Sequence, residues 1–167
     1  LSKSKKPEDK AIAFQLTKDY LAKYGKDTDE NTKKVQAYFK SERLNNFIKA
    51  IDDIKIAEAI EIGEEISIDE PDNSYIPLNL AFGAFQALSK NKDKQYINDG
   101  INYAKKALEM FEAGKLPAKF EPFKNKDDAT AVLYYVIGNF FIDIDLQTTA
   151  VNFYKAFQYD AQVKSFS

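Results

Sequence analysis

The sequence predicts an all-α fold of about seven helices, joined as antiparallel helix-turn-helix pairs. Apolar residues recur at three- and four-residue spacing along most of the chain, which is the period of an amphipathic helix. Residues that commonly end helices, namely Gly25, Pro71 and Gly114, separate these periodic stretches. No stretch alternates in the way that makes a convincing strand. Together these observations favour helices packed on helices over any class that contains a sheet.

The first helix is expected over residues 8–24, between Pro7 and Gly25. Proline is common in the first turn of a helix, and glycine is common just after the last turn. Thr28 is the expected N-cap of a second helix, whose apolar stripe continues to Ile51.

Residues 54–69 allow two interpretations. Their isoleucines alternate in part like a strand, and isoleucine favours strands. Their alanines and glutamates, however, are good helix formers, and Ile56, Ile60 and Gly63 lie along one helical face. We predict a helix that is ended by Pro71.

The next helix is expected to follow a cap at residues 72–74 and to hold Pro77 in its first turn, where the missing N–H costs little. Residues 78–88 are apolar nearly all round, so this helix is expected at the centre of the fold. A further amphipathic helix is predicted over residues 97–111.

Residues 115–126 carry two prolines and are expected to form a loop, which is long for a connection within a compact domain. Phe120 and Phe123 are expected to pin it to the body. Asp127 or Asp128 is the expected cap of the helix that follows.

Composition excludes several classes of function. The chain has 167 residues, no cysteine and no histidine. It therefore lacks disulfides, the commonest general base and the commonest zinc ligands, which excludes zinc hydrolases and serine or cysteine triads. The net charge of −2 argues against nucleic-acid binding. The longest uncharged run, residues 73–89, is shorter than the roughly 20 apolar residues of a membrane span. No catalytic residue, metal site or cofactor is predicted.

Residues 131–161 carry a pattern of aromatic and small residues at the offsets of a known helical repeat. The matching residues are Tyr134, Ile137, Gly138 and Phe141 in the first helix, and Thr149 or Ala150, Phe153, Ala156 and Asp160-Ala161 in the second. The stretch resembles a tetratricopeptide repeat, in which the glycine lets the paired helices approach closely. Residues 57–71 and 100–108 match the second helix of such a repeat in part.

The resemblance implies one domain over residues 1–167, in which repeats near 35–72, 73–114 and 127–161 follow the N-terminal helix. Such repeats stack as a short right-handed superhelix. The spacing departs from the family: Ala59 and Gly100 are 41 residues apart, whereas the usual period is about 34. The extra residues fall in the connections between the predicted helices.

The N-terminal helix resembles the segment that precedes such repeats in bacterial cell-envelope proteins. It carries Phe14 and Leu21 and ends in Lys23-Tyr24-Gly25. This likeness favours an extracytoplasmic, periplasmic or cell-envelope location in a bacterium, with a cytoplasmic location as the alternative.

The resemblance also implies a binding surface on the concave face, lined by the first helix of each repeat. The residues at the lining offsets are Tyr135, Asn139, Ile142 and Asp143 in the last repeat, Phe82 and Phe85 in the middle one, and Leu44 and Ile48 in the first. The surface lacks the lysines with which some family members clamp a peptide carboxylate. The ordinary alternative for these side chains is packing within and between repeats. We therefore predict a non-catalytic protein-interaction scaffold that binds a protein or peptide partner.

Three other functions stay open. A glycan- or small-molecule-binding domain would show exposed tyrosines around a deep pocket, whereas a scaffold would show few pockets and an exposed apolar patch. Self-assembly into a homo-oligomer is favoured by the apolar C-terminal residues Phe157, Tyr159, Val163 and Phe166. A carboxylate-based enzyme or divalent-metal protein would use Glu58, Glu61 and Glu65, although a solvated helix face is the ordinary interpretation of such a run.

Overall fold

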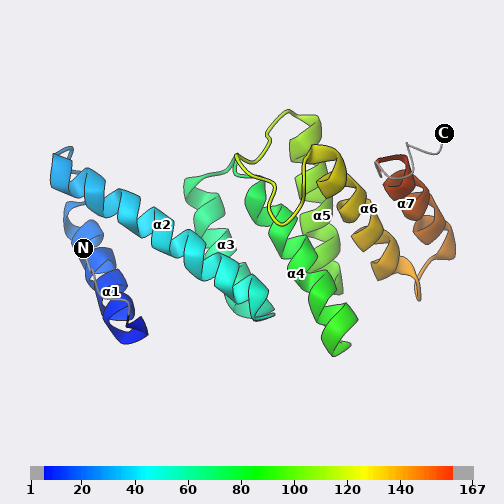
Figure 1. The fold of residues 1–167 in the computed structure, drawn as a ribbon, viewed down its shortest axis with the longest axis horizontal. Coiled ribbons are helices and arrows are strands. Elements are labelled where there is room, and N and C mark those ends of the chain that lie inside the picture. The colour runs from blue at the N-terminus through cyan, green and yellow to red at the C-terminus, as the bar shows by residue number, and fades with distance from the viewer. Residues whose placement is uncertain (1–5, 160–167) are drawn as a thin grey trace. The chain divides into compact units, whose positions relative to one another are not determined.

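A computed structural model describes residues 6–159 and shows seven α-helices and no strand in that range (Figure 1). The predicted all-α class and helix number are confirmed. The helices are α1 (Pro7–Tyr24), α2 (Glu30–Asp52), α3 (Ile56–Asp69), α4 (Tyr75–Asn91), α5 (Ile97–Glu112), α6 (Lys126–Phe141) and α7 (Leu146–Tyr159). Within the described residues, no helix is long and apolar enough to cross a lipid bilayer.

The chain packs as two compact units that divide within α2, the first ending at Ile48 and the second beginning at Lys49. In the first unit, α1 packs against the N-terminal part of α2 through stacked rings of Phe14 and Phe39, whose centroids are 5.2 Å apart. The hydroxyls of Tyr20 and Thr32 are also hydrogen-bonded at 3.1 Å.

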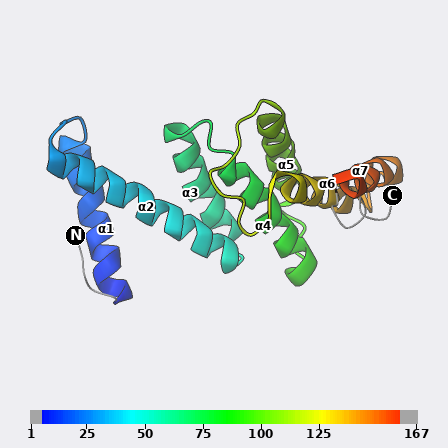
Figure 2. The same cartoon turned by 45° about the horizontal axis from the view of Figure 1, so that its top comes forward.

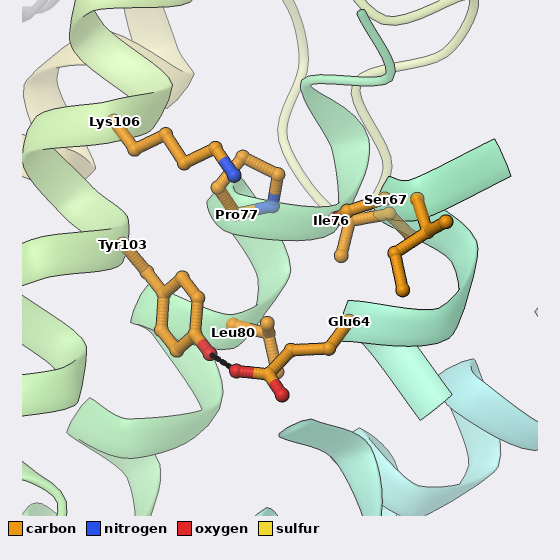
Figure 3. Close-up of a pocket in the computed structure, with 8 residues that line it drawn as sticks. Glu64, Ser67, Ile76, Pro77, Leu80, Tyr103 and Lys106 are labelled. Atoms are coloured by element: carbon orange, nitrogen blue, oxygen red, sulfur yellow. Dashed lines mark hydrogen bonds between the residues drawn. The ribbon is translucent and has the colours of Figure 1, made fainter. Parts of the chain in front are cut away.

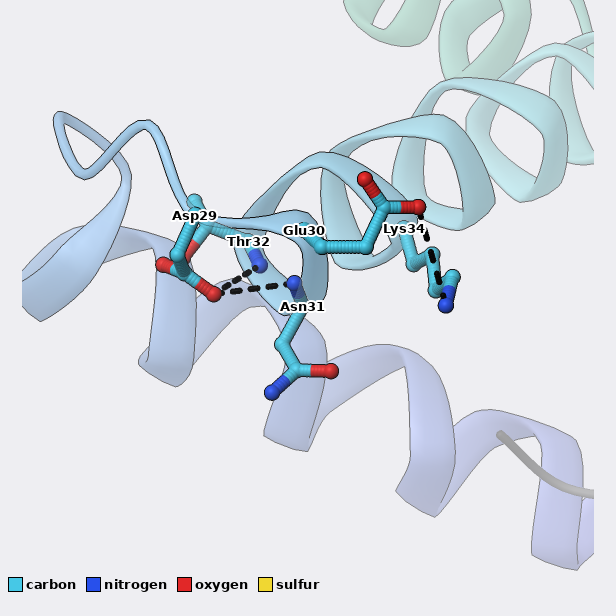
Figure 4. Close-up of polar contacts among 5 residues, drawn as sticks. All are labelled: Asp29, Glu30, Asn31, Thr32 and Lys34. Carbon is cyan, nitrogen blue, oxygen red and sulfur yellow. Dashed lines mark hydrogen bonds and ion pairs between the residues drawn. The ribbon is translucent and has the colours of Figure 1, made fainter.

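The turn between α1 and α2 is closed by an N-cap (Figure 4). The carboxylate of Asp29 accepts hydrogen bonds from the backbone N–H groups of Asn31 and Thr32. It also accepts one from the Thr32 hydroxyl, and this bond is the main cause of a lowered pKa at Asp29. The prediction of Thr28 as the cap is therefore wrong by one residue, because a carboxylate at the next position reaches more of the free N–H groups.

Helix α3 confirms the helical interpretation of residues 54–69. Its Ile56, Ala59, Gly63 and Ile66 are buried on one face, while its acidic residues point outward or to the rim of that face. Helix α4 is central in the second unit, with nine buried residues from Ile76 to Ala87. The N-cap residue of α4 is Ser74, whose side chain makes no capping hydrogen bond, and the N–H of Tyr75 donates instead to the side-chain oxygen of Asn73.

Helices α4 and α5, and likewise α6 and α7, form closely packed antiparallel pairs (Figure 1). Gly138 permits the close approach of α6 and α7, and Gly100 permits the packing of α5 against α6. A Cβ atom at Gly138 in α6 would lie 2.5 Å from two ring carbons of Phe153 in α7, and a Cβ at Gly100 in α5 would lie 2.5 Å from the ring of Phe140. Both distances are far below van der Waals contact, so only glycine fits without a shift of these two rings. The predicted role of Gly138 in close helix approach is in accord with this geometry.

The connection between α5 and α6 lies across α4 and reaches the turn between α3 and α4 (Figures 1 and 2). Phe123 is buried and meets the ring of Phe82 edge-on, with centroids 5.3 Å apart. Phe120 packs in the same way on Phe111, and Lys115 forms an ion pair with Asp72 at 2.8 Å. The expectation that the two phenylalanines pin the loop to the body is confirmed.

The cap of α6 is Asn125, not either of the two aspartates predicted. The Asn125 side chain accepts a hydrogen bond from the N–H of Asp128, and helix α6 begins at Lys126. The carboxylate of Asp128 reaches back to the N–H of Lys124. Asn125 is the N-cap because it lies one residue before the helix in extended backbone, and this conformation directs its side-chain oxygen toward the free N–H groups.

Candidate interaction surface

Tyr135 in α6 is the centre of the surface predicted to bind a partner. Its side chain is 48% exposed, although it contacts aromatic rings from two other helices. The ring of Phe85 in α4 meets it edge-on, with centroids 5.7 Å apart. The ring of Phe153 in α7 stacks on it, with centroids 5.6 Å apart and planes 28° from parallel. The structure thus brings together two of the predicted residues, Tyr135 and Phe85, and the tyrosine ring contacts side chains from α4 and α7.

The other predicted residues of the last repeat lie at the end of α6 and in the turn that follows it. Asn139 is half-buried and donates its side-chain N–H to the backbone oxygen of Tyr135 at 2.8 Å. Ile142 is 43% exposed. Asp143 is exposed and pairs with Lys94 at 3.1 Å across to the turn between α4 and α5. The arrangement is an exposed apolar strip with polar groups at one end.

Phe82 lies on the same face of α4 as Phe85 but faces the loop. It packs against the core cluster that includes Leu78 and Phe123, so the loop between α5 and α6 covers this part of the face. The position of Phe82 within its helix could not predict that the loop covers it, because the covering residue, Phe123, lies 41 positions further along the chain. Leu44 and Ile48 lie in the first unit, where both are half-buried.

A second apolar strip, on α7, was not predicted as a site. Leu146, Val151, Tyr154 and Phe157 are all exposed, and Phe157 was named only as part of the apolar C-terminal end. Leu146, Ala150 and Phe157 follow the spacing i, i+4, i+11, so the sequence does contain the signal of an outward apolar stripe. Tyr159 is half-buried and stacks on Tyr134, whereas Val163, Phe166 and Asp160-Ala161 lie outside the described residues.

Sequence reasoning also missed a cavity of about 420 Å³ between α3, α4 and α5 (Figure 3). Tyr103 of α5 donates a hydrogen bond to the carboxylate of Glu64 in α3 at 3.3 Å. Burial and, secondarily, the negative charge of Glu64 raise the pKa of Tyr103 to about 12. The cavity is lined by one tyrosine, so it lacks the ring of tyrosines expected of a glycan-binding pocket.

The glutamates considered for carboxylate chemistry are spread along α3. Glu58 forms an exposed ion pair with Lys55 at 3.7 Å. Within residues 6–159 the structure contains no group of three or more acidic side chains placed to hold a metal ion.

A scan against protein-family models and searches of curated proteins and of solved structures find no match to this chain.

Proposed function

We propose that this protein is a helical interaction module that binds a protein or peptide partner through the surface around Tyr135, without catalysis of its own. The observation that carries the proposal is the exposure of Tyr135 between Phe85 and Phe153. Tyrosine is enriched among the side chains that dominate binding energy at interfaces, and a pre-ordered ring loses little entropy when a partner covers it.

The polar groups beside the ring support the same proposal. The amide nitrogen of Asn139 is used within its helix, which leaves its oxygen able to accept a hydrogen bond from a partner. Lys94 and Asp143 form an exposed pair, and such pairs hold together by only about 0–1 kcal/mol. Either charge can therefore turn to a partner at little cost.

We further propose that the paired helices are tetratricopeptide-like. Support comes from the small residues at the α6–α7 contact: Gly138, Thr149 and Ala156 are all buried there. The hydroxyl of Thr149 donates to the backbone oxygen of Gly138 at 3.2 Å, and Ala150 is exposed, which supports Thr149 rather than Ala150 as the small residue of the proposed repeat.

The experiment that tests the binding proposal compares two tyrosines of equal exposure. Tyr135 is 48% exposed and Tyr24 in α1 is 49% exposed. Immobilised wild type, Tyr135→Ala and Tyr24→Ala are incubated with extract from the cells that make the protein, and bound proteins are identified by mass spectrometry. Circular dichroism first establishes that all three chains are folded.

A protein retained by wild type and Tyr24→Ala but lost with Tyr135→Ala would support the proposal. Equal retention by all three chains would contradict it, because the partner would then use another face. If the immobilised protein retains only its own untagged copies, and if Phe157→Ser abolishes this retention, the result would point to self-assembly through α7 instead.

A further inference from the structure

The cavity between α3, α4 and α5 has an apolar floor and a polar rim. Its floor is formed by Ile76, Pro77 and Leu80 from the first turns of α4, all of them buried. Its rim holds Glu64 and Ser67 from α3 and Tyr103 and Lys106 from α5 (Figure 3). Its volume of about 420 Å³ falls in the range of roughly 300–1,000 Å³ that is usual for ligand sites.

Ile68 marks the open side of this cavity. It belongs to the lining, yet 81% of its side chain is exposed, the largest exposed fraction among the bulky apolar residues of the described chain. An apolar side chain that left the solvent here would contact Ile68 and the floor together. Burial of that apolar surface would stabilise the contact by about 25 cal/mol for each Å² removed from water.

The charge around the opening is negative on the α3 side. Helix α3 carries five acidic residues and no basic one. Glu61, Glu65 and Ile68 follow the spacing i, i+4, i+7, so the two carboxylates lie along the same stripe as the exposed isoleucine. Both glutamates are exposed. A cation placed beside an apolar group bound at Ile68 would therefore lie nearest Glu65, and a second cation about one turn further along α3 would lie near Glu61.

Lys106 is the single cation among the lining residues, and Figure 3 shows it reaching over Pro77 on the α5 side. It lies across the opening from the α3 carboxylates. Its ammonium group can donate to a backbone carbonyl of a bound segment, since an ammonium has three donors. The opening thus offers acceptors along one wall and a donor along the other.

We propose that this cavity is a second docking site, which takes one apolar side chain from a basic segment of a protein partner. The apolar side chain enters between Ile68, Ile76 and Leu80. Flanking lysine or arginine side chains of the segment pair with Glu61 and Glu65, and a backbone carbonyl accepts from Lys106. The Tyr103–Glu64 hydrogen bond joins the two walls at 3.3 Å.

The site is independent of the surface around Tyr135. Leu80 and Phe82 are two residues apart in α4, so they point about 200° apart around the helix axis. Phe82 and Phe85 line the face of α4 that meets the loop and α6, whereas Leu80 lines the cavity. A variant at Tyr135 should therefore leave binding at the cavity unchanged.

The test measures the binding of three synthetic, fluorescein-labelled peptides to the full chain by fluorescence anisotropy. The probes are Lys-Leu-Lys-Phe-Lys, its acidic counterpart Glu-Leu-Glu-Phe-Glu, and the basic but polar Lys-Ser-Lys-Ser-Lys. The variants are Ile68→Ser and Glu61→Gln, with Ile144→Ser as the matched control. Ile144 is 64% exposed in the turn between α6 and α7. All three substitutions fall on exposed residues, so folding is expected to be kept.

We expect the basic apolar probe to bind more tightly than the other two, and more weakly as the salt concentration rises. Ile68→Ser should raise its Kd about tenfold, and Glu61→Gln should raise it by a smaller factor. Ile144→Ser and Tyr135→Ala should leave it unchanged.

Three results would overturn the proposal. The first is absence of binding by the basic apolar probe. The second is tighter binding of the acidic probe, which would assign recognition to Lys106 alone. The third is an equal loss with Ile68→Ser and Ile144→Ser, which would show non-specific adhesion to apolar surface. The surface around Tyr135 is tested by the separate capture experiment with Tyr135→Ala, so failure here is distinguishable from failure of the proposed function.

Discussion

The substitution Gly138→Ala tests the close approach of α6 and α7. A Cβ atom at this position would stand 2.5 Å from Cδ1 and Cε1 of Phe153, whereas ordinary contact begins at 3.4 Å. The Phe153 ring would have to retreat by about 0.9 Å, and it is already stacked on Tyr135. Overpacking of this kind costs about 1–3 kcal/mol. Alanine is favoured over glycine within a helix by about 1 kcal/mol, which offsets part of that cost. We expect a net destabilisation of about 1 kcal/mol.

The decisive comparison adds Phe153→Ala. Without the ring, Gly138→Ala should keep only its helix-propensity term and should stabilise the Phe153→Ala protein by about 1 kcal/mol. The sign of the effect is therefore expected to reverse between the two backgrounds. Urea unfolding followed by circular dichroism measures this, since 1 kcal/mol moves the midpoint by roughly 0.3–1 M when the m-value is about 1–3 kcal/mol/M. Additivity of the two substitutions within about 0.5 kcal/mol would refute the reasoning.

Three further predictions concern the loop, a half-buried phenol and a helix cap. Phe123→Ala should destabilise the second unit by about 3 kcal/mol, whereas Lys115→Ala should cost below about 1 kcal/mol, as an exposed pair does; urea midpoints compare the two. The pKa of Tyr103 is raised to about 12, so the folded state should lose stability as the pH rises from about 10 to about 12. Glu64→Gln should lower that pKa in an ultraviolet titration of tyrosinate, and an unchanged pKa would contradict the contribution assigned to the charge of Glu64. The pKa of Asp145 is lowered mainly by the hydrogen bond from the Thr148 hydroxyl. The Asp145 carboxylate should therefore stabilise α7 at pH values above the pKa that Asp145 has in the unfolded chain, and this stabilisation should be lost as the pH falls below 3.8. Asp145→Asn should remove the acid dependence, and Asp145→Ala should lower helicity already at neutral pH.

Helices were predictable because their signal is local. The apolar spacing of residues 54–69 outweighed their strand-like isoleucines, and the structure shows helix α3 there. Helix starts were less predictable, because neighbouring polar residues compete for the same free N–H groups. Asp29 caps α2 in place of Thr28, and Asn125 caps α6 in place of the aspartates that follow it.

The candidate sites were predictable only where one helix carries them. The offsets in α6 indicated Tyr135 and Ile142, which are exposed in the structure. Phe82 could not be placed in this way, since its covering residue, Phe123, comes from a loop after the next helix. The cavity depends on a contact between Glu64 and Tyr103, which lie 39 residues apart. A single sequence contains no local signal for such a pairing.

The most direct test of the central claim is covalent capture at the proposed surface. A photoreactive benzoylphenylalanine replaces Ile142, which is 43% exposed and follows Tyr135 by seven residues, or replaces Ile12 in α1 as the control. The protein is irradiated in the cells that make it, and adducts are resolved by mass. The proposed function predicts a discrete adduct at position 142 that disappears when Tyr135→Ala is added and is absent from position 12. The same adducts at both positions, or an adduct at 142 that survives Tyr135→Ala, would contradict it.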